Sequence, residues 1–295
     1  MKYPHYDYAI IGGDMRQVYL AQELAHSQNR IGHYALCATP DERHCQNDAI
    51  LIKTDSLSKL CDNSSCIICP IPFTKNKVFL NQCRYDENFS INTLLSNLKA
   101  GQSFFAGCIP KGFKDAAMQK GVHVFDFMDE LSLAYYNSIA TAEGAICEAI
   151  RHSSINLHHS SCAVLGYGKC GHTIAHCLKG MFCHVSVFSI KKEERSQAFT
   201  FVDNTGNLKD FETSAGKFDF IFNTIPSQIL TSQQLIKMKP SVIIIDIASA
   251  PGGVDYEAAK KLEICAILCP GLPGKYAPSS SAKAIKSIIE KIQKE

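Results

Sequence analysis

The amino-acid sequence predicts an α/β protein of two domains, each a parallel sheet with flanking helices, of which the C-terminal one is a Rossmann dinucleotide-binding domain. Three observations lead to this fold class. The chain has 295 residues, more than one hydrophobic core usually holds. Short apolar segments alternate with amphipathic ones along it, as βαβ units require. One apolar segment of the second half runs directly into a glycine-rich turn.

The first half contains short apolar segments that we expect to form buried parallel strands. The segments between them have helical spacing of apolar residues, and Asp14 is placed to cap the first helix. The expected strands are residues 8–11, 33–37, 67–69, 103–106 and 122–125, and the expected helices are residues 14–25, 91–99 and 111–120.

The second half repeats this alternation after a long segment, residues 137–152, with small and apolar residues at helical spacing. We expect this segment to be a helix that joins the two domains. An amphipathic helix is also expected over residues 279–294, with alanine and isoleucine on one stripe. The expected strands are residues 162–165, 184–188, 218–223, 242–247 and 264–268.

Composition argues against several classes of function. The net charge is +2 and there is no basic stripe, so no nucleic-acid partner is expected. There is neither a long apolar run nor a secretory signal, so we expect a cytoplasmic protein without a membrane span. Among fourteen cysteines, Cys66 and Cys69 form a Cys-x-x-Cys by count only, because side chains alternate along a strand. We expect reduced, structural cysteines and no metal site.

The glycine-rich turn is the strongest functional motif. Residues 162–165 lead into Gly166, Gly168 and Gly171, and a helix is expected immediately afterwards. The first glycine allows a tight turn, the second lets the backbone approach a pyrophosphate, and the third lets helix and strand pack closely. The N–H groups at the helix start then face the phosphates. The intervening residues of this cofactor site are Tyr167, Lys169 and Cys170.

The choice of cofactor depends on the end of the next strand. An NAD site usually carries an acidic residue there, which accepts both ribose hydroxyls. This chain has Ser189 followed by Lys191 and Lys192, and a hydroxyl with cations suits a 2′-phosphate. The sequence therefore favours NADP over NAD, the alternative being that these lysines form a solvated helix start.

Two further loops are expected to line the cofactor, because ligands bind at the carboxyl ends of parallel strands. Asn223, Thr224, Ile225 and Pro226 follow one strand, and Ala248 follows the next. By contrast, the turn Gly12-Gly13-Asp14 of the first half lacks the three-glycine pattern, and its aspartate would repel an anion.

These assignments divide the chain into four segments. We expect a flavodoxin-like or Rossmann-like domain on the substrate side at residues 1–136 and an interdomain helix and linker at 137–156. The NADP-binding Rossmann domain would then span residues 157–278, and a C-terminal helix residues 279–295.

Four motifs together carry a resemblance to a known family. They are Ile-Gly-Gly-Asp-Met-Arg-Gln at 11–17, Tyr-Asn-Ser-Ile with Thr-Ala-Glu-Gly at 136–144, Asn-Thr-Ile-Pro at 223–226 and Pro-Gly-Leu-Pro-Gly at 270–274. Taken in order along the chain, they resemble the A subunit of dipicolinate synthase. The likeness weakens at about residues 41–102 and 191–217.

This resemblance implies a bacterial sporulation enzyme that oxidises dihydrodipicolinate to dipicolinate. It implies a second component, the B subunit of dipicolinate synthase, which resembles flavoproteins, and a place in the mother-cell cytoplasm. A homo-oligomer is also possible on the sequence alone. The open alternatives are another two-domain NAD(P)-dependent dehydrogenase, or a nucleotide-binding regulatory subunit that is inactive without its partner.

A substrate with two carboxylates needs cations or free N–H groups. Arg16 is the first candidate, because its planar guanidinium can bind a carboxylate with two hydrogen bonds. Asn137, Ser138 and Thr141, at the expected start of the connecting helix, are candidates for the second carboxylate. The alternatives are a surface arginine and ordinary helix capping.

A general base would assist removal of the ring proton. The candidates are Glu143 and Asp14, and the alternative for Glu143 is an interaction with the helix dipole only.

Overall fold

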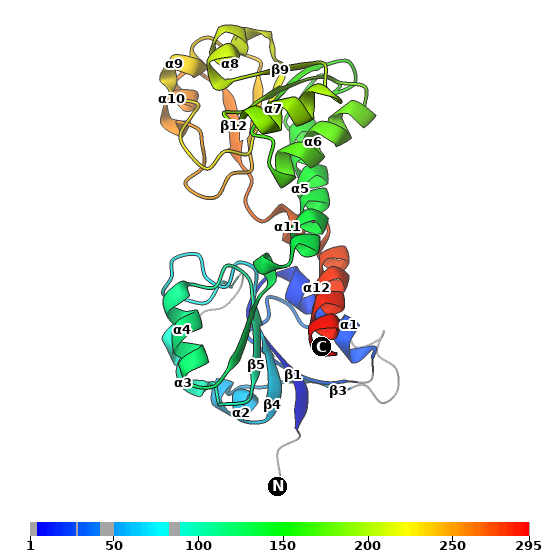
Figure 1. Ribbon diagram of the computed structural model, residues 1–295, viewed down its shortest axis with the longest axis vertical. Coiled ribbons are helices and arrows are strands. Elements are labelled where there is room, and N and C mark those ends of the chain that lie inside the picture. Colours follow the sequence, from blue (N-terminus) through cyan, green and yellow to red (C-terminus); the bar gives the residue numbers. More distant parts are fainter. Residues whose placement is uncertain (1–4, 28, 42–49, 83–88, 295) are drawn as a thin grey trace. The chain divides into compact units, whose positions relative to one another are not determined.

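The computed structural model describes residues 5–27, 29–41, 50–82 and 89–294 (Figure 1). Internal contacts divide the chain into two compact units. Unit 1 comprises Met1–Ala134 and Ala277–Glu295, and unit 2 comprises Tyr135–Tyr276. The C-terminal segment therefore belongs by its contacts to the first unit.

Unit 1 contains a parallel sheet with the strand order β3-β2-β1-β4-β5-β6 among the described residues. Helices cover both faces of this sheet, and each face has its own apolar core. The strands are β1 (Tyr6–Ile11), β2 (Arg30–Tyr34), β3 (Ile50–Lys53), β4 (Ser64–Ile68), β5 (Ser103–Ala106) and β6 (His123–Asp126).

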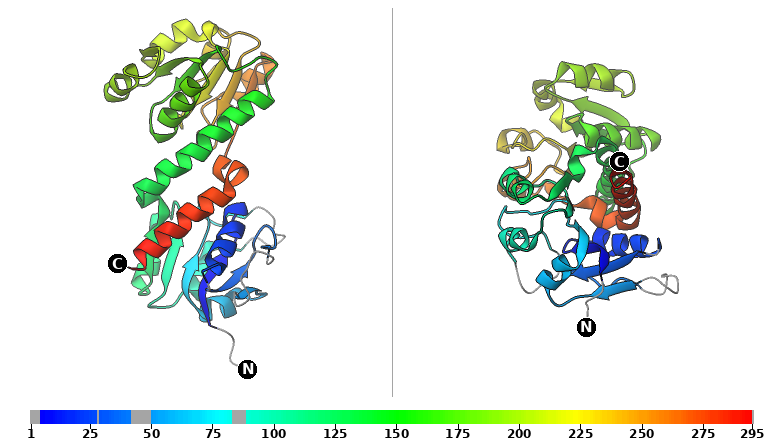
Figure 2. Two further views of the ribbon diagram at one scale, coloured as in Figure 1. Left: turned by 90° about the vertical axis from the view of Figure 1, so that its right-hand side faces the viewer. Right: turned by 60° about the horizontal axis from the view of Figure 1, so that its bottom comes forward.

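The two faces of this sheet are covered by different parts of the chain. One core includes side chains of α2 (Leu57–Asp62), α3 (Ile91–Asn97) and α4 (Lys111–Gln119). The other includes side chains of α1 (Met15–Ala25) and α12 (Pro278–Ile292), which lie side by side in Figure 2. The expected apolar stripe of the last helix is buried there. A short 3₁₀ turn, Phe127–Asp129, follows β6.

Unit 2 contains a second parallel sheet, with the order β12-β11-β10-β7-β8-β9 among the described residues. Helices cover both faces of this sheet too. The strands are β7 (Ser161–Leu165), β8 (His184–Phe188), β9 (Asn204–Gly206), β10 (Phe220–Asn223), β11 (Ile243–Asp246) and β12 (Cys265–Leu268).

The helices of unit 2 begin with α5, which spans Leu131–Arg151 and starts in unit 1. One face of the sheet packs on α5, α6 and α11, and the other on α8, α9 and α10. The remaining bounds are α6 (Lys169–Gly180), α7 (Lys192–Phe199), α8 (Leu208–Ser214), a 3₁₀ turn (Ala215–Lys217), α9 (Ser232–Leu235), α10 (Tyr256–Lys261) and α11 (Leu272–Tyr276).

The predicted fold class is confirmed, and both sheets share one strand order. Numbered from the first strand of each unit, this order is 3-2-1-4-5-6, that of dinucleotide-binding folds. In such sheets the order of the strands reverses between the first and fourth strands, and ligands bind beyond the carboxyl ends at that point. The relevant strand pairs are β1 with β4 in unit 1 and β7 with β10 in unit 2.

Several elements differ from the sequence prediction. The second strand ends at Tyr34 and not at residue 37, because Ala35 has a positive φ of 56° and the chain leaves the sheet there. The helix expected to start at residue 137 starts at Leu131. Cys66 and Cys69 lie in the cores on opposite faces of the sheet, as the alternation predicts.

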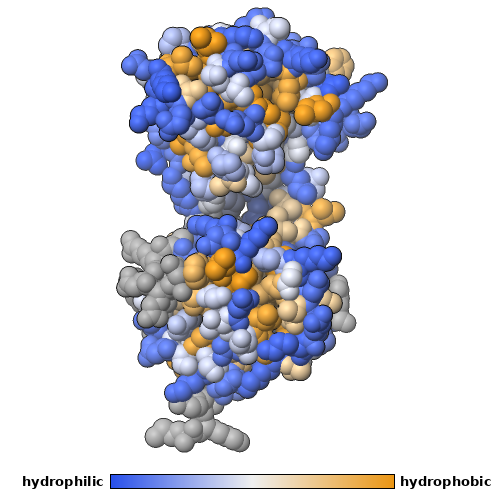
Figure 3. Space-filling view, turned by 90° about the vertical axis from the view of Figure 1, so that its left-hand side faces the viewer, coloured by the Kyte–Doolittle hydropathy of each residue, from blue (hydrophilic) through white to orange (hydrophobic). Residues whose placement is uncertain are grey.

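Among the described residues, no helix has the length and apolar character that a bilayer crossing requires. On the face seen in Figure 3, apolar side chains occur in small groups among hydrophilic ones.

Candidate functional site

The glycine turn of unit 2 lies at the carboxyl end of β7, where it contacts the ends of β8 and β10. Gly166 has a φ of +89°, and its N–H donates to the carbonyl of Phe188, at 2.8 Å. Its ideal Cβ would lie 2.4 Å from the hydroxyl of Thr224. That hydroxyl donates to the carbonyl of Leu165, at 2.9 Å. A side chain at Gly166 would therefore separate the turn from the end of β10.

The other two glycines have different surroundings. A Cβ at Gly171 would lie 2.2 Å from the carbonyl oxygen of Gly166, so α6 packs against the turn through backbone atoms. A Cβ at Gly168 would meet nothing within 4 Å. Gly168 is also the N-cap of α6 and provides no side-chain hydrogen bond to it. The start of α6 is thus open and has no side-chain cap, an arrangement that is able to accept an anion such as a pyrophosphate.

The remaining residues of the turn contact other parts of unit 2. The Tyr167 side chain is buried in the core of unit 2. The ammonium of Lys169 lies 5.8 Å from the ring centre of Tyr135. Burial raises the pKa of the Cys170 thiol, although a hydrogen bond with Thr141 and the charge of Lys169 act in the opposite direction. Cys170 is therefore a protonated, half-buried thiol at neutral pH.

The end of β8 carries an acidic neighbour that the sequence analysis missed. The Ser189 hydroxyl donates to Oε2 of Glu194, at 2.5 Å, and the Lys191 ammonium lies 3.0 Å from Oε1. The Tyr167 N–H, within the glycine turn, also donates to Oε2, at 3.3 Å. Partial burial acts to raise the pKa of Glu194, but these hydrogen bonds outweigh it and hold the pKa below its usual value. The signal in the sequence was an acidic residue at the start of the following helix.

The cations predicted for a 2′-phosphate are thus not all free. Lys191 is paired with Glu194, while Lys192 is exposed at the start of α7. Arg195 donates through Nη1 to the carbonyls of Ser189 and Ile190, both at 2.7 Å. Arg195 lies in α7, and its guanidinium therefore holds the turn that joins β8 to this helix.

The loops after β10 and β11 are joined through a buried carboxylate. Asn223 and Asp246 are both fully buried, and the Asn223 amide donates to Asp246 Oδ1, at 2.9 Å. The Ala248 N–H donates to the same oxygen, at 3.0 Å. Asn223 also accepts from the N–H of Ile225, at 3.1 Å. These four positions of the two loops are therefore held by one network.

The second oxygen of Asp246 completes this network. It accepts from the N–H of Gly253, at 2.6 Å, and from the hydroxyl of Tyr256, at 2.7 Å. Burial and the Asp246 carboxylate raise the pKa of Tyr256, which stays a neutral donor. A buried charge with donors on both oxygens is well compensated. Asp246 thus fixes the loop of residues 247–254, a role that the site prediction missed.

A second buried carboxylate holds α11, which contains part of the Pro-Gly-Leu-Pro-Gly motif. Glu148 of α5 accepts from the ammonium of Lys275 and from the hydroxyl of Tyr276. The hydrogen bond from Lys275 is the largest cause that lowers the pKa of Glu148. This carboxylate therefore remains ionised and ties the motif to α5.

In unit 1 the side chains of Asp14 and Gln17 form hydrogen bonds with the backbone at the start of α1. Asp14 caps the helix by accepting from the N–H of Arg16, at 3.0 Å, and its own N–H donates to Gln17 Oε1, at 3.2 Å. Asp14 is therefore the predicted helix cap, and its carboxylate is already an acceptor.

Arg16 is engaged inside the protein and is not the surface arginine of the alternative interpretation. Its Nε and Nη2 donate to the Asp14 carboxylate, at 2.9 and 2.7 Å, and Nη2 also donates to the carbonyl of Ile71. The residue is only 4% exposed. Nη1 takes part in none of these bonds. The amide Nε2 of the neighbouring Gln17 is buried and has no hydrogen-bond partner among the described residues.

The candidates on α5 are corrected by the position of that helix. Because α5 begins at Leu131, Asn137, Ser138 and Thr141 lie inside the helix and their N–H groups do not form its open start. The Ser138 hydroxyl donates to Tyr135 O at 2.6 Å and lies 2.7 Å from the Thr173 hydroxyl.

The other α5 candidates differ in whether their polar atoms already have hydrogen-bond partners. The Thr141 hydroxyl donates to the carbonyl of Asn137, at 2.8 Å. Oδ1 of Asn137 is buried and has no hydrogen-bond partner in the described part of the chain. Glu143 is exposed and lies well inside the helix, so an interaction with the dipole of the first turn does not apply.

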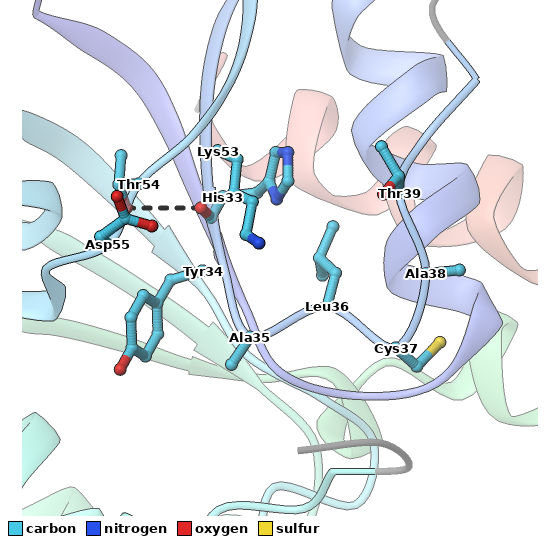
Figure 4. A pocket seen from close by; sticks show the side chains of 10 residues that line it. All are labelled: His33, Tyr34, Ala35, Leu36, Cys37, Ala38, Thr39, Lys53, Thr54 and Asp55. Carbon is cyan, nitrogen blue, oxygen red and sulfur yellow. Dashed lines mark hydrogen bonds between the residues drawn. The ribbon is translucent and has the colours of Figure 1, made fainter. Parts of the chain in front are cut away.

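A cavity of about 580 Å³ lies elsewhere in unit 1, at the carboxyl ends of β2 and β3 (Figure 4). Residues 33–39 and 53–55 line it, and none of them is a predicted site residue. The buried His33 side chain lies beside Lys53, and burial together with that cation lowers the pKa of His33 to about 4. His33 is therefore neutral at physiological pH.

No group of three or more histidine, cysteine, aspartate or glutamate side chains could hold a metal ion within the described ranges. The cysteines that the structure describes form no disulfide with one another.

Two family models match the chain. That of the N-terminal domain of the dipicolinate synthase A subunit matches residues 7–128, and that of the D-isomer specific 2-hydroxyacid dehydrogenase NAD binding domain matches residues 133–259. A curated relative, the dipicolinate synthase A subunit of Bacillus subtilis (strain 168), is 31% identical over 290 residues. This match covers 96% of the chain and 94% of the relative.

Solved structures agree with these matches. The dipicolinate synthase A chain from Bacillus subtilis has a TM-score of 0.80 and 28% identity, covering 97% of this chain and 95% of that one. The A subunit from Bacillus halodurans has a TM-score of 0.84 and 24% identity, with coverages of 99% and 98%. A transhydrogenase from Sinorhizobium meliloti has a TM-score of 0.67 and 15% identity, with coverages of 96% and 94%. The last two show similarity of fold alone.

Proposed function

Because the chain belongs to the family of dipicolinate synthase A subunits, we propose that it oxidises dihydrodipicolinate to dipicolinate with NADP. In this proposal it acts with a flavoprotein-like B subunit in the mother-cell cytoplasm of a spore-forming bacterium. The carrying observation is the open start of α6 behind Gly168, which fits a pyrophosphate. The NAD-binding family model over the same part of the chain supports an oxidoreductase with a nicotinamide dinucleotide.

A dinucleotide bound at this turn supplies a hydride acceptor. The protein's part is to hold the reacting groups in place. The first turn of α6 directs unbonded N–H groups at the phosphates, and the helix dipole favours their charge. The Asn223–Asp246 network keeps the loops after β10 and β11 rigid, so no loop ordering has to accompany binding.

For the adenosine end of the cofactor, we propose a preference for NADP over NAD. Ser189, Lys191 and Lys192 lie at the end of β8 or the start of α7, and Arg195 braces the turn between them. A hydroxyl and two ammonium groups suit a 2′-phosphate. Lys192 is exposed and has no ion pair with any residue that the structure describes, so it could bind the 2′-phosphate without breaking one.

For the substrate, we propose that Arg16 donates to one carboxylate through Nη1, with the orphaned amide of Gln17 as its neighbour. Asn137, Ser138 and Thr141 are proposed for the second carboxylate. Among them Asn137 would have to donate through its amide nitrogen, because its unbonded Oδ1 can only accept, and the two hydroxyls would have to exchange internal partners.

Of the two proposed bases, Glu143 fits better than Asp14. The Asp14 carboxylate already accepts from the backbone and side chain of Arg16, so it would have to give up these hydrogen bonds to take a proton from the substrate. Glu143 is exposed on α5. Because several proposed groups already have internal partners, a regulatory component that turns over only with its partner is the second candidate function.

The test is turnover of freshly made dihydrodipicolinate by the purified chain, followed through NADPH formation with and without the B subunit. The proposal expects oxidation in the presence of NADP, and tighter binding of NADPH than of NADH in a fluorescence titration. Activity only with the B subunit would favour the second candidate. Failure to bind either dinucleotide, or absence of turnover in both arrangements, would refute the proposal.

A further inference from the structure

The start of α7 places a carboxylate at the mouth of the glycine turn. Glu194 is the third residue of this eight-residue helix, and its Oε2 accepts from both the Tyr167 N–H and the Ser189 hydroxyl. One oxygen thus contacts the turn after β7 and the end of β8, and these two segments flank the adenosine ribose in folds of this strand order.

The chemistry of that position is selective. A carboxylate at the end of the second strand accepts ribose hydroxyls and disfavours a 2′-phosphate of the same charge. In this chain β8 ends at Phe188 and Ser189 follows it, so the rule applied to the end of the strand alone finds no acid. Glu194 provides the carboxylate from the following helix instead. Its side chain is only 18% exposed, and water therefore screens it incompletely.

The same carboxylate also withholds groups that a 2′-phosphate would use. The Ser189 hydroxyl donates to Oε2, and the Lys191 ammonium lies 3.0 Å from Oε1. A phosphate bound here must compete with Glu194 for both donors, whereas a ribose hydroxyl can donate to Glu194 directly. Each effect acts against the phosphate-bearing cofactor.

We propose that Glu194 is the residue that sets the discrimination between a 2′-hydroxyl and a 2′-phosphate, limiting the preference for NADP(H) and making NAD(H) an accepted ligand. This inference rests on the proposed dinucleotide site. It concerns the ratio of the two affinities and does not depend on which of them is larger.

The test compares Glu194→Gln with Glu193→Gln. Both variants remove one negative charge from the first turn of α7, but Glu193 is exposed and lies outside the glycine turn. Glutamine keeps the shape of the side chain and one acceptor oxygen. The chain contains no tryptophan, so the nicotinamide fluorescence of NADPH and NADH can be titrated without interference from it. Thermal unfolding of each variant verifies that the fold is retained.

We expect Glu194→Gln to raise the ratio of NADPH to NADH affinity at least tenfold, and Glu193→Gln to leave it within twofold. Glu194→Ala, as a second variant, should move the ratio in the same direction. An unchanged ratio in both Glu194 variants, with both dinucleotides still bound, overturns the role of Glu194 and leaves the proposed function standing. Equal changes in the Glu193 variant also overturn it. A wild-type protein that binds neither dinucleotide overturns the proposed function together with this inference.

Discussion

Replacing Gly168 with alanine adds one methyl group at the mouth of the candidate pyrophosphate site. The backbone of Gly168 has φ −70° and ψ −168°, an extended conformation that alanine adopts freely. The added Cβ meets no protein atom within 4 Å. The folded state should therefore lose nothing, and the reduced freedom of the unfolded chain adds about 0.4–1 kcal/mol of stability.

The effect on an anion at this position should be large. A phosphate oxygen bonded to a backbone N–H lies about 2.9 Å from the nitrogen. A carbon atom needs about 3.5 Å, so a phosphate that lies directly against the backbone of Gly168 has no room for the new methyl group and must shift. Overpacking by one methyl group costs about 1–3 kcal/mol. We expect the affinity for NADPH and for NADH to fall by about 5- to 150-fold.

The matched control is Gly180→Ala at the other end of the same helix, where an added Cβ also meets nothing within 4 Å. The assay is fluorescence titration of each dinucleotide, with thermal unfolding measured alongside. Gly180→Ala should bind like the wild type. Unchanged binding by Gly168→Ala would refute the placement of the pyrophosphate, and equal losses in both variants would show that helix stability controls binding.

Three further changes test other parts of the structure. Gly171→Ala places a Cβ 2.2 Å from the Gly166 carbonyl oxygen, and we expect a loss of about 1–3 kcal/mol in unfolding free energy together with dinucleotide binding. Arg16→Ala leaves the Asp14 carboxylate, which is 20% exposed, without its cation; a loss of about 3 kcal/mol in urea unfolding is expected, with NADPH affinity unchanged. His33 has a folded pKa of about 4 against 6.5 in the unfolded chain, so the unfolded state gains a proton first and stability falls as the pH drops from 6.5 towards 4. When the pH is lowered from about 7 to 5, the unfolding free energy of His33→Asn, measured with urea, should fall by about 2 kcal/mol less than that of the wild type. A urea midpoint equal to that of the wild type would contradict the account given for Gly171→Ala or Arg16→Ala. For His33→Asn, the contradicting result is an unfolding free energy that changes with pH in parallel with that of the wild type.

The sequence predicts buried parallel strands well, because burial on both faces leaves a continuous apolar run. Residues 103–106 and 184–188 were expected as strands, and β5 and β8 have these bounds. The strand β9 was missed, since Asn204-Thr205-Gly206 has no apolar pattern and forms by pairing with β8 at the edge of the sheet. The residues of this segment alone do not predict that pairing.

The site was predictable to the extent that it depends on local sequence. The glycine turn and its helix are consecutive in the chain, so their geometry follows from neighbouring residues. The internal partners of the polar candidates are distant: Arg16 donates to the carbonyl of Ile71, and Ser138 contacts Thr173. Such contacts depend on tertiary packing. The sequence therefore identifies the polar side chains, but it does not show whether their hydrogen-bonding groups are free to bind a ligand. Glu194 was missed for a related reason, because the rule for cofactor choice examines the strand end and not the helix after it.

The two units show how one residue decides what a shared strand order can bind. In both, a helix starts beyond the first strand, at the place where such folds hold ligands. In unit 2 the N-cap is Gly168, which has no side chain, and the N–H groups of α6 remain available to an anion. In unit 1 the N-cap is Asp14, whose carboxylate takes the helix N–H and the guanidinium of Arg16. A carboxylate already at the helix start satisfies the dipole and repels a phosphate. The turn of unit 1 could therefore bind a ligand only through groups that Asp14 leaves free, such as Nη1 of Arg16. The turn of unit 2 offers the backbone N–H groups themselves for the proposed pyrophosphate.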